Sequence, residues 1–269
     1  MSSIGGPRIV KDGLVLYLDA GNLKSYQGSG DLFNDLSINN NDSLLTNGPL
    51  FDNNSIIFDG IDDYLTFPSE IGNGYNEITV EIILEPLSLT TNRDWKFIIS
   101  SGDSISSSPE RSVFTMGINE MYNNSNLPIQ FTGLNLWFGI NAGSLSNRVR
   151  AIVDNSIWNT YLTGCAISVD PVELELNKNI IITGVYDGSV TYLYINGELK
   201  STSQSQPDGV DRSDTGGVLI TDTSPKGISS VSEPSRNSNI KFYNLKIYNR
   251  ALSSVEVLQN FNSIKDRFF

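Results

Sequence analysis

Short runs of alternating or apolar residues, separated by turn signals, fill most of the chain. They include "LVLYLD", "SIIF", "YLTF", "ITVEIIL", "LNLWFGI", "NIIITGVY", "VTYLYIN" and "NIKFYNLKIY". The dipeptides Asp59-Gly60, Asp187-Gly188 and Asn196-Gly197 accept positive φ angles and join antiparallel strands. Strands of this size and number, with no helical period between them, indicate an antiparallel sandwich rather than a parallel sheet with crossover helices.

The C-terminal segment "SSVEVLQNFNSIKDRFF" has a different pattern. Ser253 and Glu256 have the spacing of a capping box, which is typical of a helix N-terminus. Apolar residues then recur near one helical face, at Leu252, Val255, Leu258, Phe261 and Ile264. The pattern predicts one short C-terminal helix laid against the sandwich.

The sequence predicts one domain, residues 9–269, preceded by an N-terminal arm, residues 1–8. A length of 269 residues permits a single large all-β domain. Two polar stretches, 101–111 and 202–238, are rich in Ser, Asn, Asp, Gly and Pro and are typical of long surface loops. Apolar strands resume after each stretch, so neither is expected to be a domain linker.

Charge and composition exclude several functions. The chain has 18 Lys and Arg against 30 Asp and Glu, a formal net charge of −12, so phosphate backbones and anionic lipid head groups would repel it. We expect neither nucleic acid nor a membrane as a partner. The chain has no histidine, which removes Ser-His-Asp and Cys-His catalysis and the commonest zinc ligand.

The segment "LNLWFGIN" carries the best candidate binding surface. Alternation along a strand places Leu134, Leu136, Phe138 and Ile140 on one face and Asn135, Trp137, Gly139 and Asn141 on the other. An aromatic ring beside amides suits a sugar, whose CH groups pack on the ring while its hydroxyls bond to the amides. Trp158 and Tyr161 could form a second aromatic patch. The alternative for each aromatic residue is packing beneath a loop.

Several segments together resemble a known family. They are "GLVLYLDAGNLKSYQGSGDLFNDLSINNNDSLLTNGP", "IIFDGIDDYLTF", "ITVEIILEP", "GVYDGSVTYLYINGELK" and "NLKIYNRALSSVEVLQNFN". In order and spacing they are similar to the laminin-G-like branch of the concanavalin A-like lectin/glucanase superfamily, in the form found in structural proteins of tailed bacteriophages. The resemblance runs from about Ile9 to Phe268. It implies an all-β jelly-roll sandwich of two antiparallel sheets with one short C-terminal helix.

The stretch "FDGIDDYLTF" is either a turn or a metal site. We favour a turn feeding a strand, because Asp62 and Asp63 are adjacent and would point to opposite faces of an extended chain. The resemblance keeps a calcium site open as the alternative, since some members of the superfamily bind calcium. Asp59 and Asp62 would then be ligands together with backbone carbonyls. No other cofactor is expected.

The superfamily includes β-glucanases, so the acidic strand "EITVE" is the candidate for a catalytic strand. Glu77 and Glu81 share one strand face, with Thr79 between them where the glucanases have a third acid. Retaining glycosidases need two carboxyl groups about 5 Å apart, and two same-face residues four apart on a strand lie beyond that separation. We therefore expect no catalytic residues and no enzyme, with a glycoside hydrolase as the remote alternative.

The resemblance also implies a role and a location. We expect a non-enzymatic virion protein, a decoration or fibre component with a jelly-roll module that binds glycans or other surface polymers. A purely structural capsid or tail protein without a glycan ligand is the alternative. The N-terminus lacks the features of a signal peptide, which fits a protein that folds in the host cytoplasm and joins the particle there. The expected partners are other virion proteins, cell-surface or environmental polysaccharide, and symmetric copies of the same chain.

Overall fold

A computed structural model describes residues 8–89, 95–101, 113–121, 133–140, 151–152, 159–160, 163–168, 174–202, 218–219, 226–229 and 236–269. Side chains are described for all of these except 95, 101, 119–121, 133–135, 151–152, 159–160 and 163–168. The expected arm, residues 1–8, therefore lies almost entirely outside the described residues. The division into an arm and a domain 9–269 stays a prediction.

The first sheet has eight strands within the described residues, all paired antiparallel. Its order is β16 (Glu198–Thr202), β15 (Thr191–Ile195), β14 (Ile180–Tyr186), β7 (Ile78–Pro86), β18 (Asn239–Tyr248), β5 (Ser55–Asp59) and β4 (Leu50–Asp52), and β1 (Leu14–Asp19) also pairs with β18. Strand β18 has β7 on one side. On its other side, residues 239–242 pair with β5 and residues 244–248 with β1, so one long strand joins both.

The second sheet also has eight strands in the part of the chain that is described. Its order is β13 (Thr163–Ser168), β10 (Gly133–Ile140), β9 (Phe114–Met121), β8 (Trp95–Ser101), β17 (Lys226–Ile228), β6 (Tyr64–Phe67), β3 (Ser43–Thr46) and β2 (Leu32–Phe33). A separate pair is formed by β11 (Ala151–Ile152) and β12 (Asn159–Thr160). Strand β17 and its neighbour Ser229 are buried, so the expectation that 202–238 is one long surface loop is wrong at these residues.

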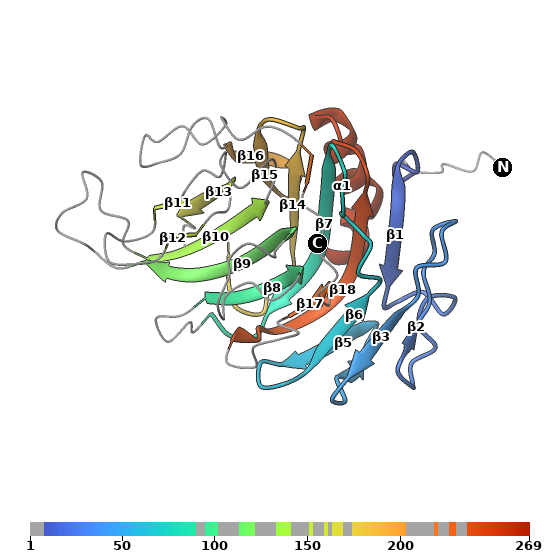
Figure 1. Cartoon of the computed structure of the whole chain (residues 1–269). Helices are drawn as coiled ribbons and strands as arrows, with labels where there is room; N and C mark the ends of the chain where they lie inside the picture. Colours follow the sequence, from blue (N-terminus) through green and yellow to red (C-terminus); the bar gives the residue numbers. More distant parts are fainter. Residues whose placement is uncertain are drawn as a thin grey trace.

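The two sheets face each other across the main apolar core, and the single helix of the described residues, α1 (Ser254–Phe268), covers the outer face of the first sheet (Figure 1). Strand alternation separates the two apolar layers. Ile82 and Ile182 belong to the core between the sheets, whereas Ile83 and Ile181 pack with Ile264 of the helix. Because β7 and β14 are covered on both faces, every residue in them is buried, which explains their continuous apolar sequences. The first sheet is called the helix-covered sheet below.

The predicted capping box is present at the start of α1. Ser253 Oγ accepts a hydrogen bond from Glu256 N at 3.3 Å, and Glu256 Oε2 accepts one from Ser253 N at 2.9 Å. The predicted apolar face is partly wrong, because Val255 and Leu258 are exposed while Val257, Asn260 and Ile264 are buried. The helix is rotated so that a polar residue, Asn260, lies at the centre of the buried face.

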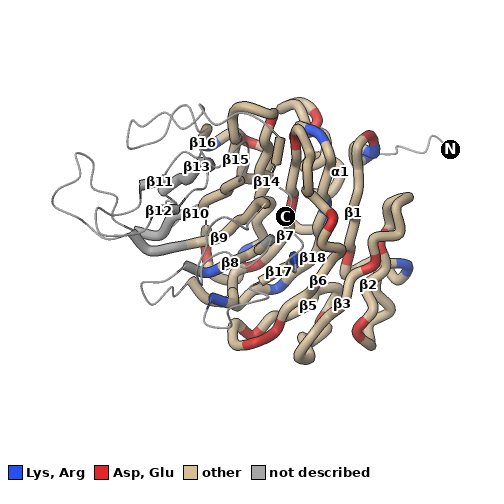
Figure 2. The backbone as a smooth tube through the Cα atoms, viewed as in Figure 1, with Lys and Arg blue, Asp and Glu red and all other residues tan. Residues whose placement is uncertain are grey.

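Two antiparallel sheets and one helix confirm the predicted jelly-roll sandwich. The predicted hairpin is also confirmed: Asn196 and Gly197 have φ angles of 51° and 82° and connect β15 to β16. No helix in the described residues is long and apolar enough to cross a membrane. Among the described residues, the acidic side chains lie on several strands of the helix-covered sheet, on α1 and on turns and loops, rather than on one strand (Figure 2).

Candidate functional site

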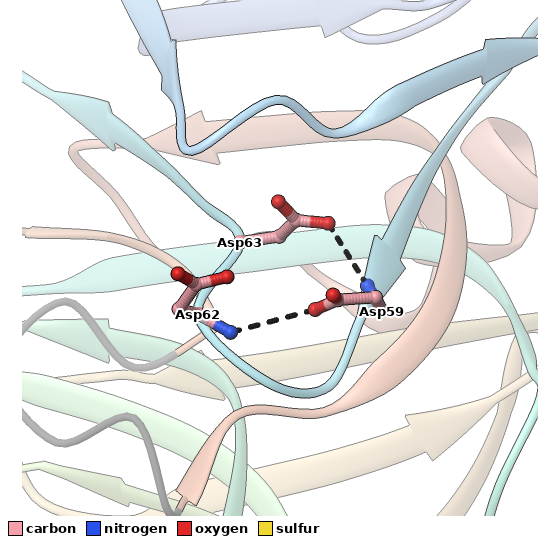
Figure 3. A group of neighbouring side chains, drawn as sticks. All are labelled: Asp59, Asp62 and Asp63. Carbon is pink, nitrogen blue, oxygen red and sulfur yellow. Dashed lines mark hydrogen bonds between the residues drawn. The ribbon is translucent and has the colours of Figure 1, made fainter.

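The acidic turn, Asp59 to Asp63, connects β5 of the helix-covered sheet to β6 of the second sheet (Figure 3). Asp59 Oδ1 accepts hydrogen bonds from the backbone N–H groups of Ile61 at 2.7 Å and Asp62 at 3.4 Å. Asp63 Oδ2 accepts one from Asp59 N at 3.1 Å. The turn is therefore closed by the carboxylates of Asp59 and Asp63. Asp59 and Asp62 are exposed, whereas Asp63 is buried.

The expectation that Asp62 and Asp63 point apart is wrong. Residues 60–63 form a turn rather than extended chain, and β6 begins only at Tyr64. One carboxylate oxygen from each of Asp59, Asp62 and Asp63 lies within 4.8 Å of the others. Burial raises the pKa of Asp63, and the negative charges of Asp59 and Asp62 raise it further, against the hydrogen bond from Asp59 N.

Three carboxylates offer oxygen donors of the type that calcium prefers. Calcium takes about six to eight oxygens, so carbonyls or water would have to complete the shell around the acidic turn. Asp59 and Asp63 each already use one oxygen on backbone N–H groups. The oxygens are of the type that a hard cation binds, but they are fewer than a calcium shell needs. The predicted calcium ligands, Asp59 and Asp62, are brought together with Asp63 as a third candidate.

Trp137 lies on the face of β10 that points away from the main core. Leu136, Phe138 and Ile140 belong to that core and Trp137 does not, as strand alternation predicts. Across the second sheet, Phe97 of β8, Gly117 of β9 and Trp137 are register neighbours. A Cβ atom added to Gly117 would lie 3.0 Å from the indole, so the glycine lets the ring lie close over β9. Phe97 meets the indole edge-on, with ring centroids 5.8 Å apart.

This packing buries the indole, which is 6% exposed. Trp137 is therefore not an open platform in this structure, and its role in glycan binding stays a prediction. Of the other predicted glycan-binding residues, Asn135 lies on β10 but its side chain is outside the described set. Asn141, Trp158 and Tyr161 lie outside the described residues.

The acidic segment "EITVE" consists of Glu77 and the first four residues of β7, and it faces the C-terminal segment. Glu77 Oε2 accepts a hydrogen bond from Ala251 N at 2.9 Å. Thr79 Oγ1 donates to Arg250 O and accepts from Leu252 N, both at 2.9 Å. These contacts hold the chain that leads from β18 into α1, so this strand face is covered rather than open as a catalytic cleft would be.

Glu81 is the most deeply placed acid of that face, with a side chain 1% exposed. Its Oε1 lies 2.7 Å from Lys246 Nζ, which is fully buried, and its Oε2 accepts a hydrogen bond from Asn260 Nδ2 at 3.2 Å. Asn260 also accepts from Val10 N at 2.8 Å and donates to Tyr248 OH at 3.0 Å. We call these five residues the buried network. Sequence reasoning missed Lys246 and Asn260, because their partners are distant along the chain.

The fold and these sites define a lectin-like β-sandwich with a helix packed on one sheet. The family model of the concanavalin A-like lectin/glucanases superfamily matches residues 59–258, and the chain belongs to this superfamily. No protein of curated function matches the sequence.

Solved structures with a similar fold include two toxin domains and a sialidase. The binding domain of botulinum neurotoxin DC in complex with SialylT has 14% identity and a TM-score of 0.60. The binding domain of Paraclostridial Mosquitocidal Protein 1 has 16% identity and a TM-score of 0.59. The match covers 94% of this chain and 52% of the other chain in both cases. The Trypanosoma rangeli sialidase has 14% identity and a TM-score of 0.56, over 95% of this chain and 33% of the sialidase. The chain thus spans about half the length of the two toxin domains and about a third of the sialidase.

Proposed function

We propose that the protein is a non-catalytic jelly-roll module that binds glycans or other surface polymers. The observation that carries this proposal is the fold, a concanavalin A-like sandwich. Two of the similar structures are binding domains, and one of these was solved with SialylT bound. A glycan array probed with the purified protein tests the proposal. Reproducible binding to a family of related glycans is the expected result, and an array without any binding would contradict it.

The absence of catalysis is part of the proposal. It is supported by the contacts of Glu77 and Glu81, which hold the C-terminal segment and the helix instead of facing a cleft. A reducing-end assay on β-glucans and bacterial exopolysaccharides should show no turnover. Turnover that is abolished by Glu77→Gln or Glu81→Gln would establish a hydrolase and overturn this part.

We further propose that the module works on the virion of a tailed bacteriophage, on capsid or tail, in several symmetric copies. The support is the sequence resemblance to phage structural proteins, which extends over nearly the whole chain. The excess of 30 acidic over 18 basic residues would limit adhesion to packaged DNA. Mass spectrometry of gradient-purified particles should detect the polypeptide. A polypeptide found in the soluble lysate and never with sedimenting particles would contradict this assignment.

One observation favours the second candidate, a decoration protein without a glycan ligand. Trp137 offered the best sugar platform in the sequence, and its ring is buried against Phe97 and Gly117. A protein that is found on particles but binds nothing on the array would have this structural role.

A further inference from the structure

A pocket of about 400 Å³ lies where the end of α1 meets the segment before β14 and the β15–β16 turn. Its wall includes Glu175, Asn177, Lys178, Asn179, Asn196, Phe268 and Phe269. The volume falls in the range of small-molecule sites, about 300–1,000 Å³. We propose that this pocket is a subsite for one neutral sugar residue, an inference that rests on the proposed glycan-binding function.

Phe269 supplies an exposed aromatic surface at this pocket. It is 59% exposed, and Phe51 is the other exposed aromatic side chain of the described set. The position of Phe269 is fixed by a hydrogen bond from its N–H to Lys265 O at 2.8 Å and by the ring of Phe261, whose centroid is 6.1 Å away. A held, solvent-facing ring is the surface on which the CH face of a sugar packs.

Three asparagines add amide groups to the wall. Asn196 Oδ1 accepts a hydrogen bond from Ile181 N at 2.9 Å, so its NH₂ group is the part that can meet a ligand. Asn179 Nδ2 donates to Phe268 O at 2.8 Å, and its buried Oδ1 accepts no hydrogen bond within the described structure. The side chain of Asn177 is exposed. Amide donors and acceptors together match the two-way hydrogen bonding of sugar hydroxyls.

Two of these asparagines have backbone positions that other residues rarely adopt. Asn177 and Asn196 have φ angles of 59° and 51°. Asparagine tolerates this left-handed region, so each residue serves its turn and presents an amide at the pocket at the same time.

The charges of the pocket indicate a neutral ligand. Lys178 is the one cation among the wall residues, and its Nζ lies 2.5 Å from Glu175 Oε2. The side-chain charges of Lys178 and Glu175 cancel, so no unpaired cationic side chain of the wall faces a carboxylate or phosphate group on the ligand. Neutral hexoses and N-acetylhexosamines therefore fit the pocket better than acidic sugars such as sialic acid.

Saturation-transfer NMR and calorimetric titration test the subsite on the full chain. The probes are glucose, galactose, mannose and N-acetylglucosamine, with N-acetylneuraminic acid as the acidic comparison. We expect at least one neutral sugar to bind and Phe269→Ala to weaken that binding about fivefold or more. The matched control, Phe51→Ala, removes the other exposed aromatic ring, on β4 at the far edge of the same sheet, and should leave the dissociation constant within about twofold.

The outcomes separate this subsite from the proposed function. Two results would overturn the subsite without contradicting the glycan-binding function. The first is sugar binding that is unchanged in Phe269→Ala. The second is binding on the glycan array when no neutral monosaccharide binds. Preference for N-acetylneuraminic acid overturns the neutral class. Absence of binding in both experiments overturns the subsite and the function together.

Discussion

Replacing Asn260 by alanine should destabilise the fold strongly, because the buried network depends on this side chain. Asn260 is fully buried and bonds to Val10 N, Glu81 Oε2 and Tyr248 OH. Alanine leaves the Val10 N–H without its acceptor and removes one of the partners of the buried Glu81 carboxylate. Each buried group left unsatisfied costs about 1–3 kcal/mol, and more when the group is charged.

The higher helix propensity of alanine offsets up to about 0.7 kcal/mol of this loss in stability. The net loss in the free energy of unfolding should therefore be about 3 kcal/mol, which lowers the Tm by roughly 6–12 °C in a chain of this size. Urea and thermal denaturation followed by circular dichroism measure both quantities. If the loss exceeds the free energy of unfolding of the native protein, the variant will show the circular dichroism spectrum of an unfolded chain, which also supports the prediction.

Asn262→Ala is the matched control for this experiment. It makes the same chemical change two residues further along α1, at a partly exposed position outside the buried network. Its effect should stay within about 0.5 kcal/mol. Equal stabilities of the Asn260→Ala and Asn262→Ala variants would refute the conclusion that the buried network holds the helix to the sheet.

Three further predictions concern pH, calcium and the buried tryptophan. The Arg250 guanidinium, 2.6 Å from Glu256, lowers the pKa of that carboxyl from 4.5 to about 2. Because the carboxyl of the unfolded chain is protonated at a higher pH than that of the folded chain, the free energy of unfolding should fall as the pH drops from about 4.5 to 2. In urea denaturation at a series of pH values, Glu256→Gln should reduce this fall. Thermal melts with calcium and with a chelator should nearly coincide, because the acidic turn is closed by its own hydrogen bonds. At a calcium concentration a hundredfold above the Kd, a true site would add about 2.7 kcal/mol to the free energy of unfolding and raise the Tm by several degrees. If Trp137 contributes to polymer binding, Trp137→Phe should weaken binding on the glycan array by a factor that corresponds to about 1 kcal/mol in a variant that remains folded; unchanged binding would leave the indole a packing role alone.

Features set by neighbours in sequence could be predicted. The positive φ of Asn196 and Gly197 and the capping contacts of Ser253 with Glu256 depend on residues two or three apart, and the sequence shows both directly. Strand alternation also placed Trp137 on the correct face of β10. These features identify the elements of the sandwich.

Features set by distant partners could not be predicted. Asn260 looks like a solvent-facing residue in the helix pattern, yet it is buried because Val10 and Glu81, 250 and 179 residues away in sequence, meet it in space. The burial of Trp137 likewise depends on Gly117 and Phe97 from two other strands. The prediction for Asp62 and Asp63 failed for a local reason. It assumed that adjacent side chains of an extended chain point to opposite faces, but the chain forms a turn at these residues.

The position of β18 has a consequence for how this chain is made. On one side its first half pairs with β5 and its second half with β1, while β7 lies along its other side, so residues 239–248 complete three strand pairings at once. During synthesis from the N-terminus, β1 and β5 emerge more than 170 residues before the strand that joins them. Until β18 is made, the backbone N–H and C=O groups on the edges of β1 and β5 that face it stay unpaired, and unpaired strand edges can pair with other nascent chains. Because these contacts join residues that are distant in sequence, we expect the sheet to close slowly and late in folding. Chaperones that shield exposed strands during translation should therefore raise the yield of native protein.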